Sequence, residues 1–496
     1  MGLVQKDAFR TTVISYVGIL LGYLNKGVLF LLVLSTAQIG LVNLIVSIGT
    51  LFAQLANFGT IFATWKFFPF MRNQDKNHHG FLTFILLFVG AGILLYTVLY
   101  IVFREQIQAG YVENSRMFID YYYWILPIGI AYVIFMVLEI YLRSLYKNIV
   151  SVFAYEIVLR VATTVILLLK WMHLISFDTF VILHSLLYLI PTMILIIYLR
   201  RMNEFTVGLS QIKISKRFKK IVFYYSSFSY LNTLGTVWVN SLDVLMIAQL
   251  VGLEGAGVFT TVVFISSALQ VPYKSIMRVS SPLVSDYWKH RQMDKMKDLY
   301  VKTSSVSLVI GLGMFILAWA NIDFLFSFLK PEFQEGIWVF FFIMIGRLVD
   351  MYFGLNGAIF TTSKKYRYDI FFTVFLMVAV YVLNAIMIPI WGIVGASIST
   401  TVALLVYNFG RLIFVWVVYK LHPFNLNQFI IIVLGILALA AGHFTQGIIN
   451  NKWIQFLVES TLVSVVFFVP IYVFSLEKET VNYIKKAFAF IKSKIA

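Results

Sequence analysis

The chain has 496 residues, of which 60% are hydrophobic and only 12% are charged, and it contains no cysteine. Soluble domains carry about a quarter of their residues as charged side chains, so this composition excludes a soluble protein and predicts an all-α integral membrane protein. Disulfides, thiol catalysis and cysteine metal sites are excluded as well. The net charge of +17 comes from Lys and Arg clusters between apolar runs, a pattern typical of membrane topology signals and not of nucleic-acid binding.

Apolar runs long enough to cross a bilayer recur along the whole chain. The first run is interrupted by Asn25 and Lys26 and has no small-residue cleavage site after it, so it is interpreted as a transmembrane helix and not as a signal peptide. With about 20 residues needed for each span, we expect about fourteen transmembrane helices. Their predicted positions are 12–34, 41–63, 81–103, 121–142, 150–169, 177–199, 224–248, 255–277, 303–322, 336–360, 369–389, 393–419, 427–448 and 453–475.

Basic residues indicate the orientation of these helices. Most of the 39 Lys and Arg residues fall in every second connection between predicted helices. These connections include the N-terminal segment, the cluster 200–220 and the cluster 274–302. Cytoplasmic loops are enriched in Lys and Arg, so both termini are predicted to be cytoplasmic. The longest outer connections, 104–117 and 323–335, are too short to form a folded domain.

The basic linker 200–220 divides the chain into two groups of six helices, which suggests an internal repeat. At an offset of about 217 residues, Gly40 aligns with Gly257 and Lys26 aligns with Asp243, and we expect two lobes of similar architecture. The predicted organisation is a six-helix lobe at 1–199, the linker 200–220, a second six-helix lobe at 221–419, helices 13 and 14 at 420–475, and a basic cytoplasmic tail at 476–496.

Polar residues form a stripe on the second predicted helix, where they recur at steps of three and four and therefore share one face. The eighth helix repeats this stripe more weakly. Such faces are expected to line a substrate cavity, although hydrogen bonding between neighbouring helices is an alternative role for each side chain. The residues are Asn43, Ser47, Thr50, Gln54 and Asn57 on the second helix, and Thr260, Ser267 and Lys274 on the eighth.

Most charges inside the predicted spans have an opposite charge three or four residues away, which favours a structural role. These pairs are Glu139 with Arg143, Glu156 with Arg160, and Arg347 with Asp350. Arg411 and Asp369 lie near the predicted inner surface, where snorkelling toward water explains them.

Lys26 and Asp243 have no opposite charge at such spacing. A charge in the middle of a membrane needs a partner or a wet cavity. The two residues are therefore predicted to gate or couple transport, either by pairing when the outer side closes or by binding substrate and coupling ion. A permanent salt bridge that holds the lobes together is the alternative. A cation or proton at Asp243 is physically reasonable, although nothing in the sequence selects the ion.

Motifs of enzyme chemistry are absent from the sequence. There is no phosphate-binding glycine loop, no HExxH motif and no DxD pair. His78 and His79 are adjacent in an inner loop, and His184 and His443 are isolated in helices, so none has metal-ligand spacing. We expect no catalytic residue, no metal site and no cofactor, and we do not expect an enzyme.

Three stretches carry a family resemblance: SLDVLMIAQLVGLEGAGVFTTVVFISSALQVPYKSIMRVSSPLVSDYW from Ser241, FGLNGAIFTTSKKYRYD from Phe353, and PIWGIVGASISTTVALL from Pro389. They resemble the polysaccharide-transporter branch of the multidrug/oligosaccharidyl-lipid/polysaccharide (MOP) flippase superfamily, which includes the O-antigen and capsule repeat-unit flippases. The resemblance implies a fourteen-helix, two-lobe transporter of the bacterial inner membrane. Such a transporter would move lipid-diphosphate-linked oligosaccharides between leaflets by alternating access.

For the substrate that the resemblance implies, Lys26 and Lys274 are expected to attract the diphosphate and acidic sugars, while Asn43, Gln54 and Asn57 bind sugar hydroxyls. The expected partners are the lipid-linked oligosaccharide, the bilayer and a coupling cation or proton, with other polysaccharide-assembly membrane proteins as candidates. Within transporters, a peptidoglycan-precursor flippase and a drug exporter are alternatives. An alternative of another class is a membrane polysaccharide polymerase or ligase, which would need a larger outer loop than this chain offers.

Overall fold

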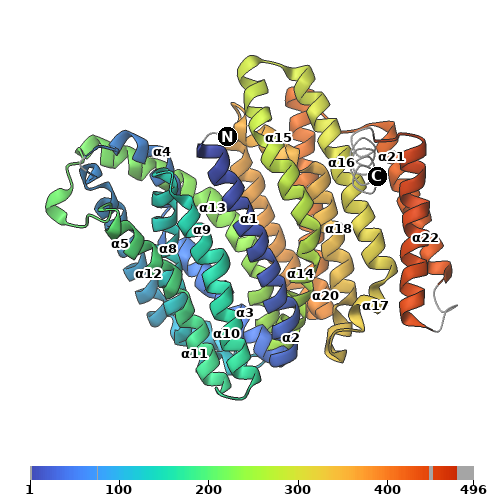
Figure 1. Cartoon of the computed structure of the whole chain (residues 1–496), viewed down its shortest axis with the longest axis horizontal. Coiled ribbons are helices and arrows are strands. Elements are labelled where there is room, and N and C mark those ends of the chain that lie inside the picture. Colours follow the sequence, from blue (N-terminus) through green and yellow to red (C-terminus); the bar gives the residue numbers. More distant parts are fainter. Residues whose placement is uncertain (1–2, 75, 446–450, 478–496) are drawn as a thin grey trace, which may run out of the picture. The chain divides into compact units, whose positions relative to one another are not determined.

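The computed structural model describes residues 3–74, 76–445 and 451–477, and within them every regular element is a helix (Figure 1). The chain divides into two compact units, Met1–Thr261 and Val262–Ala496. The first unit extends past the predicted linker and includes α13 and the start of α14. These compact units need not coincide with the two lobes of the predicted internal repeat, whose boundaries stay a prediction.

In the first unit, two membrane helices contain a π-helical turn, at η1 and at η4, and several others are joined by short turns. The core lies between α3, α4, α5, α8 and α12, where apolar side chains of all five helices are buried. The helices are α1 Leu3–Leu24, η1 Asn25–Leu29, α2 Phe30–Val33, α3 Thr36–Ala56, α4 Thr60–Met71, α5 Phe81–Val102, α6 Arg104–Ala109, α7 Arg116–Asp120, α8 Ile125–Ser144, α9 Asn148–Phe153, η4 Ala154–Val158, α10 Leu159–Trp171, α11 Phe177–Leu187, α12 Leu189–Arg201, α13 Lys216–Leu250 and α14 Leu253–Ser266.

In the second unit, α18 packs along α20, and α16 packs against α18, α21 and α22. The helix α20 is broken in the middle at Gly392, whose φ of 56° and ψ of −135° are not helical. This break separates the predicted helices 369–389 and 393–419. The helices are η6 Ser267–Leu269, α15 Gln270–His290, α16 Met293–Ala320, α17 Ile322–Phe326, α18 Ile337–Phe353, α19 Leu355–Thr362, α20 Asp369–Tyr419, α21 Leu426–Thr445 and α22 Lys452–Val473.

Twelve helical stretches among the described residues are long and apolar enough to cross a membrane, which confirms the predicted fold class and a multi-pass membrane protein. The count of fourteen and the cytoplasmic termini stay predictions. The predicted helix 41–63 has the wrong bounds, because it is interrupted at Asn57–Gly59. Phe58 and Gly59 have φ values of 48° and 73°, and α4 starts again at Thr60.

The start of α3 shows why the sequence folds as it does there. The Ser35 hydroxyl accepts a hydrogen bond from the Gln38 amide, and the Gln38 side chain accepts one from the Ser35 amide, which forms a capping box. The helix therefore begins at Thr36, five residues before the predicted start at 41. The capping box satisfies two amide groups that would otherwise be unpaired in an apolar environment.

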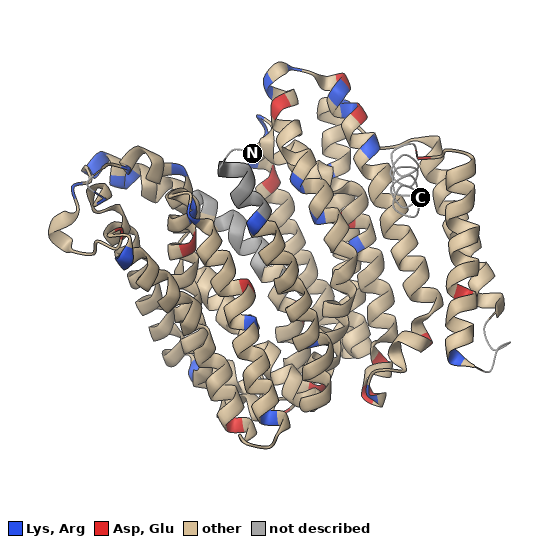
Figure 2. Cartoon of the chain, viewed as in Figure 1, with Lys and Arg blue, Asp and Glu red and all other residues tan. Residues whose placement is uncertain are grey.

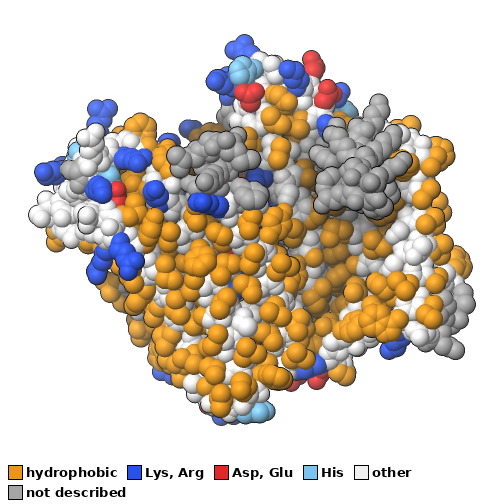
Figure 3. Space-filling model, in the orientation of Figure 1, with side chains coloured by type: hydrophobic (Ala, Val, Ile, Leu, Met, Phe, Trp, Pro, Cys, Tyr) orange, Lys and Arg blue, Asp and Glu red, His pale blue; other side chains and the backbone are white. Residues whose placement is uncertain are grey.

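Charge and apolar surface are segregated in each unit. Figure 2 shows Lys and Arg gathered mainly at helix ends and connections. On the face drawn in Figure 3, hydrophobic side chains cover the flanks of the helices. Large apolar side chains on these flanks are strongly exposed, for example Leu20 at 70% and Leu94 at 67%. A soluble protein rarely exposes such a surface, whereas lipid covers it without cost.

The helices α3 and α14 cross with direct backbone contact at two glycines. A Cβ atom added at Gly40 would lie 1.9 Å from the Leu253 carbonyl oxygen, and one added at Gly257 would lie 2.0 Å from the Thr36 carbonyl oxygen. The two contacts are reciprocal, since Thr36 and Gly40 are each separated from their counterparts Leu253 and Gly257 by the predicted repeat offset. Small residues permit such close approach of membrane helices, and no other side chain fits here.

Gly40→Ala is therefore expected to destabilise the protein by about 1–3 kcal/mol, because the added methyl group overlaps a backbone carbonyl. The measurement is the thermal midpoint of the purified protein in detergent. Gly90→Ala on α5 is the matched control, since a Cβ at Gly90 meets no described atom within 4 Å. Equal midpoints for the two variants would contradict the close crossing.

Candidate functional site

A polar contact lies one helical turn beyond the glycine crossing. The Asn43 side-chain amide donates a hydrogen bond to the Thr260 hydroxyl at 3.2 Å, and the Thr260 hydroxyl donates to the Ala256 carbonyl at 2.7 Å. Asn43 and Thr260 are 217 residues apart, the predicted repeat offset. Two residues of the predicted polar stripes therefore meet at equivalent positions of the repeat.

Lys26 joins this contact from the first helix. Its Nζ donates a hydrogen bond to Asn43 Oδ1 at 3.1 Å, and the Lys26 side chain is exposed. Asn43 accepts through its oxygen and donates through its nitrogen, so it connects Lys26 to Thr260. We refer to Lys26, Asn43 and Thr260 as the Lys26 cluster. It brings together a lysine ammonium, an amide and a hydroxyl within apolar helices.

The backbone that presents Lys26 is the π-helical turn η1. Asn25, only 3% exposed, fixes this turn to α10, because its side-chain amide donates to the Arg160 carbonyl at 2.8 Å. The Thr164 hydroxyl donates in turn to Asn25 Oδ1 at 2.7 Å. Single π-turns within α-helices occur frequently at functional sites. The polar pair Asn25–Lys26 in an apolar run is the one feature of the sequence that marks this turn.

A second π-turn, η4, packs against α1 and carries Glu156. The Arg160 guanidinium lies 2.5 Å from the Glu156 carboxylate, and Arg160 also donates to the Gly18 carbonyl. A Cβ at Gly18 would lie 2.7 Å from Glu156 Cβ, so glycine makes room for this pair. The predicted Glu156–Arg160 and Glu139–Arg143 ion pairs are both confirmed.

The rest of the α3 stripe is occupied by contacts within the protein. The Thr50 hydroxyl donates to the Ser47 carbonyl at 2.9 Å, and Gln54 accepts from the Asn57 amide at 3.1 Å. Asn57 is 1% exposed, and its Oδ1 accepts from the Gly59 amide at 2.7 Å, which fixes the turn between α3 and α4. In this conformation the Asn57 side chain stabilises the backbone of the α3–α4 turn. Substrate binding by Thr50, Gln54 and Asn57 stays a prediction.

The remaining predicted site residues are Asp243, Ser267 and Lys274. Asp243 is buried on α13, a helix that packs against α3, and its pairing with Lys26 stays a prediction. Ser267 and Lys274 belong to the second unit. The Ser267 hydroxyl donates to the Phe264 carbonyl at 2.6 Å, and Lys274 is exposed on α15.

The second unit contains a buried ion pair that the sequence interpretation missed. Nε and Nη2 of Arg411 donate to Asp369 Oδ1 at 2.9 and 2.6 Å, and the guanidinium lies 4.7 Å from the Tyr407 ring centroid. Snorkelling was the wrong explanation for these residues, since their exposed fractions are 9% and 4%. They are 42 residues apart on the two halves of α20, so spacing along one helix could not reveal the pair.

Near this pair, Asp350 on α18 accepts a hydrogen bond from the Asn408 amide at 3.4 Å. The predicted Arg347–Asp350 pair stays a prediction. His78 is buried, and its Nε2 lies 2.7 Å from Glu204 Oε2, so it is satisfied within the fold as expected for a core histidine. Within residues 3–74, 76–445 and 451–477, no group of three or more His, Cys, Asp or Glu residues could hold a metal ion.

Neither the protein-family models nor the curated proteins give a match to this sequence. Solved structures do match over nearly the whole chain. The lipid II flippase MurJ in an inward closed conformation is 14% identical, covers 94% of this chain and 98% of its own length, and gives a TM-score of 0.72.

Two other similar structures are transporters of the MOP superfamily. An inward-facing multidrug resistance MATE family transporter is 14% identical with a TM-score of 0.58, over 86% of this chain and 96% of its own length. A MOP superfamily transporter from Pyrococcus furiosus Vc1 is 14% identical with a TM-score of 0.51, over 88% and 96%. At this identity the likeness shows the fold: the chain has the fold of MOP superfamily transporters.

Arg411→Ala is expected to destabilise the protein by about 3–5 kcal/mol, because it leaves the Asp369 carboxylate buried without its partner. The double variant Arg411→Met, Asp369→Leu should recover part of this loss, since it removes both charges. Thermal midpoints in detergent measure both effects. Arg143→Ala is the control, because the Arg143 side chain is 53% exposed and loss of an exposed pair costs at most about 1 kcal/mol. Equal losses at Arg411 and Arg143 would contradict the buried pair.

Proposed function

We propose that this protein is a flippase that moves lipid-diphosphate-linked oligosaccharide repeat units across the bacterial cytoplasmic membrane for surface polysaccharide biosynthesis. The Lys26 cluster is the observation that carries the proposal. It combines one cation with an amide and a hydroxyl, on helices of a fold shared with a lipid II flippase. A diphosphate next to sugar hydroxyls needs the same combination of groups.

The energetic argument starts from the cost of a lysine inside a membrane helix, about 3 kcal/mol on insertion scales. Asn43 is a neutral hydrogen-bond partner of Lys26. A cation in a region of low dielectric constant attracts anions strongly. A diphosphate is an anion that every lipid-linked sugar of this class carries.

We assign sugar binding to the polar residues of the predicted stripes, which begin with Asn43 on α3 and Thr260 on α14. Asn43 and Thr260 already share a hydrogen bond, which a sugar hydroxyl can replace on both sides. Lys274 on α15 is a second cation for the diphosphate or an acidic sugar. The proposed binding residues are Lys26, Asn43, Thr50, Gln54, Asn57, Thr260, Ser267 and Lys274.

Alternating access requires a contact that exists in one state only. We assign this role to Lys26 and Asp243, which occupy equivalent positions of the repeat. Their pairing closes one side of the cavity, and competition for Lys26 by the diphosphate opens it. A coupling cation or proton would act at Asp243. A ligand shifts such an equilibrium only by its different affinity for the two states.

A peptidoglycan-precursor flippase is the second candidate, favoured by the TM-score of 0.72 with the lipid II flippase MurJ. A drug exporter is less favoured, because the MATE transporter covers 86% of this chain and MurJ covers 94%. The lipid-linked intermediate that accumulates in cells lacking the gene separates the candidates. An oligosaccharide on a lipid diphosphate supports the proposal, whereas lipid II or an unchanged lipid pool contradicts it.

Lys26→Ala is expected to reduce export of surface polysaccharide by about 10- to 100-fold, the loss of one charge-assisted hydrogen bond to phosphate. Quantified cell-surface polysaccharide in a deletion strain that expresses each variant is the measurement. Lys170→Ala, on the last turn of α10, is the control and should export normally. The variant must give the same size-exclusion profile as the parent protein. Normal export by a folded Lys26→Ala protein would sink the assignment.

The gating role predicts a charge-swap result. Lys26→Asp and Asp243→Lys should each abolish export, because each places two like charges at the gate. The double variant should recover at least about a tenth of the parent activity, since the attraction is restored with reversed sign. The readout is again surface polysaccharide. A double variant as inactive as the singles would argue against direct pairing.

A further inference from the structure

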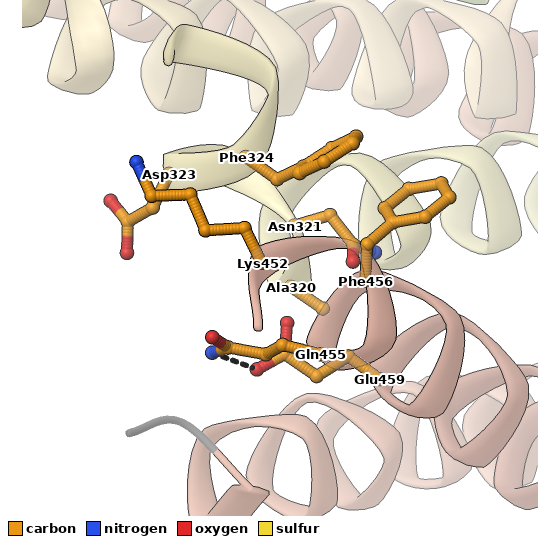
Figure 4. Close-up of a pocket in the computed structure, with 8 residues that line it drawn as sticks. All are labelled: Ala320, Asn321, Asp323, Phe324, Lys452, Gln455, Phe456 and Glu459. Carbon is orange, nitrogen blue, oxygen red and sulfur yellow. Dashed lines mark hydrogen bonds between the residues drawn. The ribbon is translucent and has the colours of Figure 1, made fainter. Parts of the chain in front are cut away.

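A cavity of about 150 Å³ lies in the second unit, and none of the residues assigned above lines it (Figure 4). It is formed where α16 ends and α22 begins. The lining residues are Ala320, Asn321, Asp323, Phe324, Lys452, Gln455, Phe456 and Glu459. Figure 4 shows Gln455 and Glu459 side by side on α22, and Asn321 at the junction of α16 and α17.

Two buried hydrogen-bond acceptors border this cavity, and one of them lacks a donor. Glu459 is 3% exposed, and its Oε1 accepts one hydrogen bond, from the neutral Gln455 amide at 3.0 Å. Asn321 is 2% exposed; its nitrogen donates to the Leu317 carbonyl at 2.8 Å, while its Oδ1 has no hydrogen-bond partner among the described atoms. Buried acceptors of this kind are nearly always satisfied in proteins. The group that completes the site must donate hydrogen bonds.

The charge of Glu459 indicates which kind of group the cavity binds. A buried carboxylate in a membrane helix needs a positive partner, and no ion pair is formed by Glu459 within the described part of the chain. A water molecule needs only about 10–15 Å³ of such volume, so the cavity can hold a group of several atoms. A cationic group that donates several hydrogen bonds fits both the two acceptors and the volume. A primary ammonium has these properties.

Aromatic rings border the same space. Phe324 and Phe456 stack with centroids 4.4 Å apart, and Trp453 lies 5.0 Å from Phe324. Ring faces attract ammonium groups. Trp453 is 62% exposed in the first turn of α22, as expected for the aromatic belt at a membrane–water interface. Phospholipid headgroups occupy this depth.

The exposed Lys452, at the first residue of α22, provides the other half of a zwitterion site. Its ammonium group and the positive end of the helix dipole favour a phosphate at the mouth of the cavity. A headgroup that carries a phosphate and a primary ammonium a few atoms apart can satisfy Lys452 and Glu459 together. We propose that this cavity binds a primary ammonium group, supplied by the headgroup of an ethanolamine phospholipid from the surrounding leaflet.

The experiment measures lipid retention by native mass spectrometry of the full chain, after equilibration in micelles with equal amounts of phosphatidylethanolamine and phosphatidylcholine. We expect a preference of about tenfold for the ethanolamine lipid, because the quaternary choline group cannot donate hydrogen bonds. Mono- and dimethylated ethanolamine lipids should bind progressively more weakly to the parent protein. Equal retention of all headgroups by the parent protein would overturn the phospholipid as the source of the ammonium group, independent of any variant.

Glu459→Gln should bring the ratio of the two lipids close to one. Glu332 is an exposed acid in η7 (Pro331–Gly336) of the same unit, and Glu332→Gln should leave the ratio unchanged. A second arm adds free ethanolamine to protein in phosphatidylcholine. If free ethanolamine raises the thermal midpoint of the protein but the protein shows no lipid preference, the cavity binds an ammonium group and a soluble amine supplies it. Stabilisation by sodium chloride alone, lost in Glu459→Gln, would overturn the ammonium assignment in favour of an inorganic cation.

Discussion

The arrangement of the candidate site depends on the backbone contact between α3 and α14. Because Gly40 and Gly257 bring the two helices together without side chains between them, the next turn places Asn43 within 3.2 Å of Thr260. Hydrogen-bonding groups that would otherwise face lipid or a wide cavity are thereby positioned by packing. The contact joins equivalent residues of the repeat. The α3 half and the α14 half of the site therefore have similar backbones at the crossing, and they differ in the side chains around it.

Four charged residues in the described part of the chain illustrate three kinds of contact. Glu156 is neutralised within its own helix, and Asp369 is neutralised by a guanidinium from the other half of α20. Lys26 and Glu459 instead contact neutral amides, those of Asn43 and Gln455. The two ion pairs stabilise the fold. The two charges that contact amides are the ones to which we assign proposed functions.

The sequence predicted the fold class well because lipid imposes simple rules on composition and run length, and the repeat offset of 217 recurs in the Asn43–Thr260 hydrogen bond. Contacts between distant helices were not predictable from spacing. Arg411 and Asp369 show this, since two charges that each appeared isolated proved to be partners. Asn57 shows a second limit: stripe periodicity cannot distinguish a side chain facing a cavity from one that caps a turn. Asn321 and Glu459 gave no periodic signal at all.

The two π-turns have a consequence for comparing this chain with others. A π-turn contains one residue more than the α-helical path it replaces, and each residue of an α-helix corresponds to about 100° of rotation. Relatives that lack the turn at η1 must therefore be aligned with a one-residue gap within Asn25–Leu29, and similarly within Ala154–Val158. Without these gaps, Lys26 would be matched to a neighbour that points in another direction. An invariant cation could then be misread as a variable one.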